Sequence, residues 1–77
     1  MPTIKRFSNC AIEIYNREHG RPHFHVIFSD GDRCAIDIET LEVLAGEVKR
    51  PARLREALLW ASANRSLLMG YWRKENR

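Results

Sequence analysis

The stretch Pro22-His-Phe-His-Val-Ile-Phe28, with Ser29-Asp-Gly-Asp32 and Arg33-Cys-Ala-Ile-Asp-Ile38 after it, decides which fold the chain can adopt. Apolar residues occupy every second position on both sides of a short polar segment. This period-two alternation is typical of half-buried antiparallel strands that turn one face toward a core. We therefore expect a β-hairpin whose core-facing residues are Phe24, Val26, Phe28, Cys34, Ile36 and Ile38.

The pairing within this hairpin follows from the requirement that both apolar sets share one face. Phe28 and Cys34 can both face the core only if the numbers of paired residues add to an even value. A two-residue turn would give an odd sum, so we expect a three-residue loop with Gly31 in a left-handed conformation. The sequence then allows Asp37 to lie opposite either of two histidines, His25 or His23.

Further strands are expected on both sides of the hairpin. The alternation of Cys10, Ile12 and Ile14 predicts a preceding strand, which a longer loop over residues 16–22 connects to the hairpin. Shorter strands are expected at residues 3–7 and 42–48. If Ile14 pairs with Phe24, Glu13 lies opposite His25 and Tyr15 lies opposite His23.

From Pro51 the apolar period changes from two to that of a helix, and proline suits a first helical turn. We expect one helix over residues 51–73, which at 1.5 Å per residue would be ~33 Å long. Strands of seven residues reach only ~23 Å, so this helix should extend beyond the sheet. Its broad apolar arc fits either a curved sheet wrapped around the helix or a protein-binding surface formed by Trp60, Leu67, Tyr71 and Trp72.

These elements predict an α+β fold in one domain, residues 1–77. A curved antiparallel sheet of four or five strands occupies residues 1–48, and one long C-terminal helix, residues 51–73, packs on one face. Residues 74–77 are expected to be a tail. A chain of 77 residues is small enough to be marginally stable alone, which favours a partner or a second copy.

Composition and charge restrict the classes of function. No apolar run approaches the ~20 residues that cross a bilayer, and residues 1–9 lack a secretory core, so we expect a cytoplasmic protein. Cys10 and Cys34 lack the CxxC spacing of zinc or redox motifs and are expected to be buried thiols. The net charge of +3 combines −3 over residues 1–48 with +6 over residues 49–77.

The basic C-terminal part admits two interpretations. It is a solvated helix face, or it binds nucleic acid through cationic side chains. The second interpretation is the weaker one, because the charges are spread around the helix rather than gathered in a stripe. Its candidate residues are Lys49, Arg50, Arg53, Arg55 and Arg73.

All three histidines fall within the segment His19-Gly-Arg-Pro-His23-Phe-His25, and the last two point to one face of a strand. One interpretation is a divalent transition-metal site made by His19, His23 and His25, with Glu13 or Asp37 as an alternative third ligand.

A second interpretation is acid–base chemistry in a row of Glu13, His25 and Asp37, with His23 beside it. Nearby arginines that bind phosphate would suit RNA cleavage, and the candidates are Arg17, Arg21 and Arg33. In a third, structural interpretation, His23 and His25 hydrogen-bond the loop of residues 16–22.

The chain resembles a small bacterial family named domain of unknown function 4160. The matching residues are Met-Pro-Thr-Ile at 1–4, Phe7, Tyr15, His19, Pro22-His-Phe-His25, Ile36-Asp-Ile-Glu-Thr40, Glu42-Val-Leu, Gly46-Glu47, Trp60 and Trp72. Genes of this family often lie beside that of a second small protein, an arrangement similar to a toxin–antitoxin pair. Two residues depart from the family pattern, and they are Leu41, where Gly is usual, and Asn64, where a helical His is common. The first departure suggests a wider turn, and the second removes any role of that His.

Two functional hypotheses follow. The first is a cytosolic bacterial interaction protein of a two-gene, toxin–antitoxin-like module. It would bind the small protein from the neighbouring gene, or a second copy of itself, through the extended helix. The alternative is a metal-binding or RNA-cleaving protein that uses the cluster His19, His23 and His25.

Overall fold

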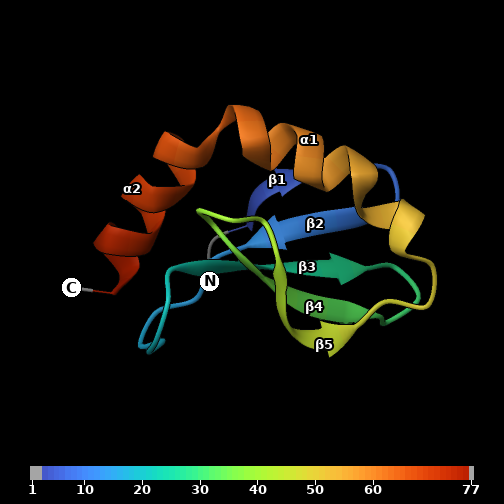
Figure 1. Cartoon of the computed structure of the whole chain (residues 1–77), viewed down its shortest axis with the longest axis horizontal. Coiled ribbons are helices and arrows are strands. Elements are labelled where there is room, and N and C mark those ends of the chain that lie inside the picture. The colour runs from blue at the N-terminus through green and yellow to red at the C-terminus, as the bar shows by residue number, and fades with distance from the viewer. Residues whose placement is uncertain (1–2, 77) are drawn as a thin grey trace.

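A computed structural model describes residues 3–76, which form a five-stranded antiparallel sheet with helices on one face (Figure 1). The strands follow one another in the sheet in sequence order, so β3 is the central strand. The expected α+β class is therefore confirmed, with five strands rather than four. Their bounds are β1 Thr3–Arg6, β2 Cys10–Glu13, β3 His23–Phe28, β4 Arg33–Asp37 and β5 Val43–Glu47.

The pairing around β3 has the even register that the apolar alternation predicts. On one side Glu13 of β2 lies opposite His25. On the other side Asp37 of β4 lies opposite His23, which decides between the two pairings left open by the sequence. Cys10 lies opposite Phe28 and Cys34 lies opposite Val26, and both thiols are buried and free.

The β3–β4 hairpin has the expected three-residue loop. The amide of Phe28 donates to the carbonyl of Asp32 (2.8 Å), and the amide of Gly31 donates to the carbonyl of Phe28 (3.0 Å). Gly31 has a φ of 99°, in the left-handed region that glycine adopts without a steric penalty. The loop therefore preserves the alternation, and the apolar residues of both strands face the same side.

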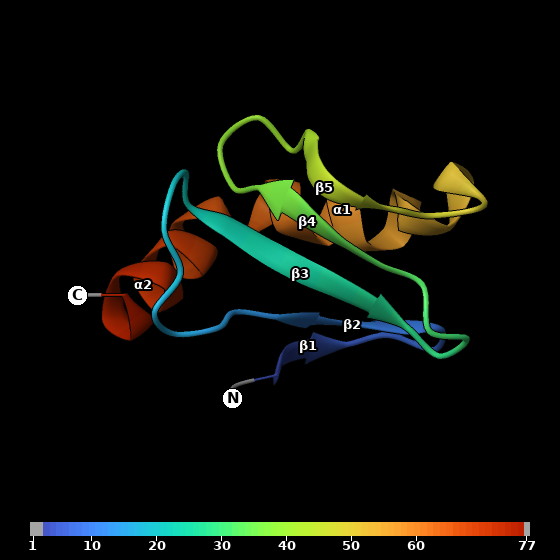
Figure 2. The ribbon, with the colours of Figure 1, turned by 90° about the horizontal axis from the view of Figure 1, so that it is seen from below.

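The C-terminal part contains two α-helices, so the expectation of one helix over residues 51–73 is wrong. A 3₁₀ turn, η1 (Pro51–Leu54), leads into α1 (Arg55–Ala63), and α2 (Arg65–Glu75) follows after a break at Asn64. In Figures 1 and 2, α1 lies over the sheet, whereas α2 turns toward the end where β3 begins. α2 also includes residues 74 and 75 of the expected tail, and Arg77 lies outside the described residues.

A side-chain hydrogen bond replaces a backbone one at the break. In a continuous helix the Asn64 amide would donate to the carbonyl of Trp60, but here it donates to the carbonyl of Ala61 (3.1 Å). The side-chain Nδ2 of Asn64 donates to the Trp60 carbonyl instead (2.8 Å). Asparagine competes with the helical backbone in this way, and the φ of Asn64 is −128°.

The core lies between the sheet and the helices. Inward-facing strand residues such as Phe24 and Val26 are fully buried, and their counterparts on the helices include Ala57, Ala61 and Leu68. The outward-facing positions of β2, β3 and β4 form the open face of the sheet, which Figure 2 shows from below. Among residues 3–76, no helix has the length and apolar character needed to cross a bilayer.

Gly46 provides a test of the sheet geometry, because a side chain at this position has no space. Its φ is 85°, and an added Cβ would lie 2.5 Å from the carbonyl oxygen of Arg33 and 2.9 Å from Cα of Cys34. We predict that Gly46→Ala lowers stability by about 2–4 kcal/mol, since a left-handed alanine costs about 1–2 kcal/mol before any overlap. Thermal unfolding measures the effect.

Gly31→Ala is the matched control, because Gly31 also has a positive φ but its added Cβ would meet nothing within 4 Å. It should cost only the penalty of a left-handed alanine, about 1–2 kcal/mol. Equal losses of Tm in the two variants would contradict the close approach of β5 to β4.

Candidate functional site

Four rings form a row on the open face and around the end of the sheet. Trp72 of α2 contacts His23 (ring centroids 4.9 Å apart), His23 contacts His25 (5.2 Å), and Tyr15 contacts His25 (4.4 Å). His23 and His25 share a face because they are two residues apart on β3. His23 also reaches Trp72, since it is the first residue of β3 and α2 lies at that end of the sheet.

The carboxylate of Glu18, from the loop of residues 16–22, meets both histidines. Its Oε1 lies 2.9 Å from Nε2 of His25 and 3.6 Å from Nε2 of His23. The hydrogen bond from His25 is the largest influence on Glu18 and lowers the pKa of its carboxyl group. An ionised carboxylate only accepts hydrogen bonds, so Nε2 of His25 carries the proton of this contact.

The other nitrogen of His23 has a defined partner. Nδ1 lies 2.7 Å from the carbonyl oxygen of Arg21, which can only accept, so Nδ1 is the protonated nitrogen. In neutral His23 the lone pair of Nε2 therefore faces the Glu18 carboxylate. Two electron-rich atoms repel each other, and a metal ion bound by both would relieve this repulsion.

One ligand atom from each of Glu18, His23 and His25 lies within 4.8 Å of the others. Two imidazoles and one carboxylate form a donor set that suits zinc and several other divalent transition metals. The side chains are 29%, 11% and 17% exposed, respectively, so the cluster is shielded but accessible. A carbonyl bound to the second nitrogen of an imidazole, as in His23, is the usual means of orienting a histidine ligand.

The loop that carries Glu18 is anchored by Asn76, the residue that follows α2. Oδ1 of Asn76 accepts a hydrogen bond from the Glu18 amide (2.7 Å), and its Nδ2 donates to the Tyr15 carbonyl (3.0 Å). Nδ2 also lies 3.2 Å from the carbonyl oxygen of Trp72, which holds the amide group to its own helix. Asn76 therefore fixes the loop, and with it the carboxylate, relative to the histidines.

His19 does not join this cluster, although the sequence singled it out as a metal ligand. It is exposed, and together with His23 it lines a hollow beside the cluster. The third member of the cluster is its neighbour, Glu18, which sequence analysis missed. The only available signal was an acidic residue in the loop before His23, and an irregular loop has no period from which side-chain direction can be derived.

Glu13 lies opposite His25, as predicted, but its carboxylate has other partners. Its Oε1 accepts a hydrogen bond from the Tyr15 hydroxyl (2.7 Å), and Oε2 lies 3.5 Å from the hydroxyl of Thr3. Burial is the main cause that raises the pKa of the Tyr15 hydroxyl, and the bond to Glu13 adds to it. Glu13 thus orients Tyr15, whose ring covers His25.

Asp37 lies opposite His23, and its buried carboxylate holds the turn between β4 and β5. Oδ1 accepts hydrogen bonds from the amides of Glu39 (2.7 Å) and Thr40 (3.0 Å), and Oδ2 forms an ion pair with Nε of Arg21. These amide bonds, that of Thr40 first, lower the pKa of the Asp37 carboxyl group. The predicted row of Glu13, His25 and Asp37 is therefore not formed. Glu13 bonds Tyr15, Asp37 bonds the turn amides, and the carboxylate that contacts His25 is that of Glu18.

Leu41, where the family usually has Gly, lies in the same turn. The Leu41 amide donates to the Asp37 carbonyl (2.9 Å), and its φ of 64° is left-handed. This conformation costs a non-glycine residue about 1–2 kcal/mol. The hydrogen bonds to Asp37 hold the turn closed despite that cost, so a wider turn is not needed to accommodate leucine.

The expected partner-binding residues divide into two pairs. Trp72 is 9% exposed and belongs to the core, and Trp60 packs edge-on against Phe7 (6.4 Å). Leu67 is 46% exposed, and with Tyr71 it lines a hollow of about 270 Å³ on α2. Only the second pair thus contributes to an accessible apolar surface.

The basic residues singled out in the C-terminal part are divided between the β3–β4 hairpin and the helices. Arg53 pairs with Asp30 (3.0 Å) and Asp32 (3.3 Å), and its guanidinium lies over the ring of Phe28 (4.2 Å). The hydrogen bond from Arg53 is the main cause that lowers the pKa of Asp30. Lys49 and Arg50 lie beside this acidic hairpin, whereas Arg73 is on α2.

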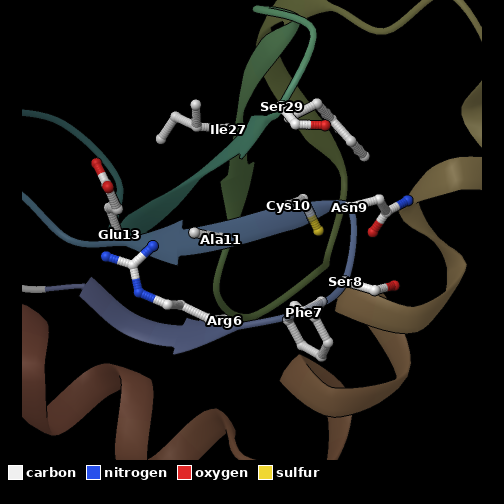
Figure 3. A pocket seen from close by; sticks show the side chains of 10 residues that line it. Arg6, Phe7, Ser8, Asn9, Cys10, Ala11, Glu13, Ile27 and Ser29 are labelled. Carbon is white, nitrogen blue, oxygen red and sulfur yellow. The ribbon is translucent and has the colours of Figure 1, made fainter.

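A further hollow of about 280 Å³ lies beside the β1–β2 turn (Figure 3). Arg6 and Glu13 lie at one side of it, and Phe7, Ser8 and Asn9 lie at the other. Within the described residues, Oδ1 of Asn9 is buried without a hydrogen-bond partner. Glu13 is the one residue lining this hollow that the sequence singled out as a site residue. None of Glu18, His23 and His25 lines it, so the hollow is separate from the histidine cluster.

Comparison with known proteins agrees with the resemblance seen in the sequence. A family described as domain of unknown function (DUF4160) matches residues 10–73. The chain belongs to this family. No curated protein and no solved structure matches the chain. Family membership thus covers β2 to α2, including every residue of the cluster, and assigns no activity.

The position of Asp37 predicts a pH-dependent contribution to stability. A folded-state pKa below that of the unfolded chain means that the ionised carboxylate stabilises the fold above about pH 4, and that this stabilisation is lost as the pH falls through the lowered value. Asp37→Ala should destabilise the protein by about 2–4 kcal/mol at pH 7, because two amides lose their acceptor.

Urea unfolding at pH 7, 5 and 3 measures this contribution. The difference between wild type and Asp37→Ala should be constant from pH 7 to 5 and smaller at pH 3. Glu42→Gln, which removes an exposed carboxylate near the same turn, controls for loss of charge and should change little. A difference that stays equal at all three pH values would show that the Asp37 charge has no part in holding the turn.

Proposed function

We propose that this protein binds a divalent transition-metal ion through Glu18, His23 and His25. The observation that carries the proposal is the convergence of three ligand atoms within 4.8 Å, with the lone pair of neutral His23 directed at a carboxylate. A bound cation would turn this repulsive contact into an attractive one. To bind the metal, Nε2 of His25 must give up its proton, which moves to Nδ1 if the imidazole is neutral and is released to solvent if the ring is doubly protonated.

Three protein ligands leave coordination positions open. A closed structural zinc site has four protein ligands, whereas a site with three binds water or a substrate in the remaining position. We therefore infer a centre that exchanges a ligand, in which the metal activates or orients a bound molecule.

Metal analysis of protein purified without a His tag tests the proposal. We expect about one ion per chain, binding that weakens as the pH falls, and a rise in Tm when zinc, iron(II), nickel or copper is added. Glu18→Gln, His23→Ala and His25→Ala should each lower affinity by more than ~100-fold, beyond the ~10–100-fold cost of an outer-shell change.

His19→Ala is the matched control, because His19 lies in the same loop but outside the cluster. Asn76→Ala should have an intermediate effect of about 10-fold, since it frees the loop but retains the ligands. A metal content near zero, with no change of Tm on addition of any of the four metals, would leave only the structural interpretation, in which the histidines hold the loop.

We also propose a second role, as the cytoplasmic interaction protein of a two-gene module similar to a toxin–antitoxin pair. The observation that favours it is the accessible hollow on α2, which Leu67, Gly70 and Tyr71 line and at whose rim Leu67 is 46% exposed. Exposed apolar side chains around an accessible hollow are a common feature of binding surfaces. The partner in this proposal is the small protein from the neighbouring gene.

Light scattering of the protein alone and mixed with its neighbour's product tests this role. A complex of the two chains is expected, and Leu67→Lys should weaken it at least about 10-fold because a charge would enter the apolar contact. Arg55→Glu, on the exposed surface of α1, should not. A dimer of the protein alone would identify a second copy as the partner, and no complex in either sample would reject the proposal.

A further inference from the structure

A trough runs along the open face of the sheet between β3 and β5. It consists of two adjoining hollows of about 220 and 260 Å³ that share Ala35 and Ala45. These two alanines lie directly opposite each other in the β4–β5 pairing and form the floor. Small side chains in adjacent strands leave a depression between the larger residues on either side.

Both proposed histidine ligands line this trough, one in each half. The first half is bounded by His19, Arg21, His23 and Leu44, and the second by His25, Arg33, Cys34 and Gly46. A molecule in the trough therefore lies beside the cluster of Glu18, His23 and His25. The open coordination positions of a metal there would be within reach of such a molecule.

An arginine stands in each half, and both are held in place. Arg21 is 63% exposed and is tied to the buried carboxylate of Asp37 through Nε, so its two terminal nitrogens remain for another partner. Arg33 donates from Nη2 to the hydroxyl of Tyr15 (3.2 Å), whose ring covers His25. Pre-ordered guanidinium groups lose less entropy on binding an anion than mobile ones do.

The charge balance of the trough depends on the metal. Without one, the Glu18 carboxylate beside the histidines opposes an anion, and Glu47 lies opposite Arg33 in the register. A divalent cation bound to Glu18 would make the local charge positive. The two arginines would then dominate the electrostatic potential of the trough. Guanidinium groups and a metal with open positions are the groups that bind phosphate oxygens.

We propose that this trough binds the phosphate group of a phosphate ester, with one oxygen on the metal and others on Arg33 and Arg21. The inference rests on the proposed metal centre and names the ligand class that such a centre would take. Metal and phosphate binding are then coupled, so each raises the affinity for the other by the same factor. A nucleotide and single-stranded RNA present the same chemistry, and their affinities distinguish the two sources.

The test follows the amide resonances of zinc-loaded and zinc-free protein by NMR during titration. The probes are inorganic phosphate, adenosine 5′-monophosphate and a pentauridylate. We expect shifts at Ala35, Ala45 and Arg33 with zinc, and binding at least about 10-fold weaker without it. An RNA source predicts that pentauridylate binds more tightly than the monophosphate, and a nucleotide source predicts the reverse.

Variants locate the contact. Arg33→Gln should weaken phosphate binding about 5- to 10-fold, as expected for loss of one charge-assisted contact, whereas Glu47→Gln should strengthen it. Ala45→Phe should abolish binding by filling the trough, and Ala45 is exposed, so the fold should tolerate the change. Arg73→Gln on α2 is the control and should have no effect.

Two results would overturn the inference. One is zinc-loaded protein that shows no shifts with any probe, which would leave the metal proposal intact. The other is phosphate binding with equal affinity in Arg33→Gln, Ala45→Phe and wild type, which would place the anion elsewhere. If the protein takes up no metal, the metal proposal is rejected. If that metal-free protein binds phosphate and Arg33→Gln does not weaken the binding, the trough is rejected as the phosphate site as well.

Discussion

The alternation of side chains along β3 is the constraint on which the rest of the structure depends. Phe24 and Val26 point into the core, and His23 and His25, which alternate with them, point out. Because β3 is the central strand, a slip of one residue would exchange the two sets and place imidazoles against the helices. The register that buries the core therefore also assembles the site, and neither can be altered without the other.

Much of the fold follows from the sequence because period and parity are local constraints. They predict the β3–β4 hairpin, its three-residue loop and the pairing of Glu13 with His25. The break at Asn64 does not follow, since apolar residues recur at helical spacing across it. A single side-chain bond, from Asn64 to the Trp60 carbonyl, ends α1, and such a bond leaves no trace in the periodicity.

The site was predictable only where it belongs to a strand. Alternation gives the direction of His23 and His25, but Glu18 reaches them from an irregular loop whose position is set by Asn76, 58 residues away in the chain. For Asp37, in contrast, the sequence predicts the position but not the role. Its place opposite His23 follows from one of two allowed registers, yet its carboxylate is taken up by the amides of Glu39 and Thr40. Register places a residue, and local hydrogen bonding then determines its role.

The sequential strand order has a consequence for the kinetics of folding. Each strand pairs with its neighbour in the chain, so the sheet forms by closing short loops, which costs little entropy and favours rapid assembly. The contact between Asn76 and Glu18 closes a far longer loop, and it becomes favourable only once α2 has docked. We therefore expect the Asn76 anchor of the Glu18 loop to form late in folding. By the same logic, fraying of one helical turn releases Glu18 while the sheet remains folded.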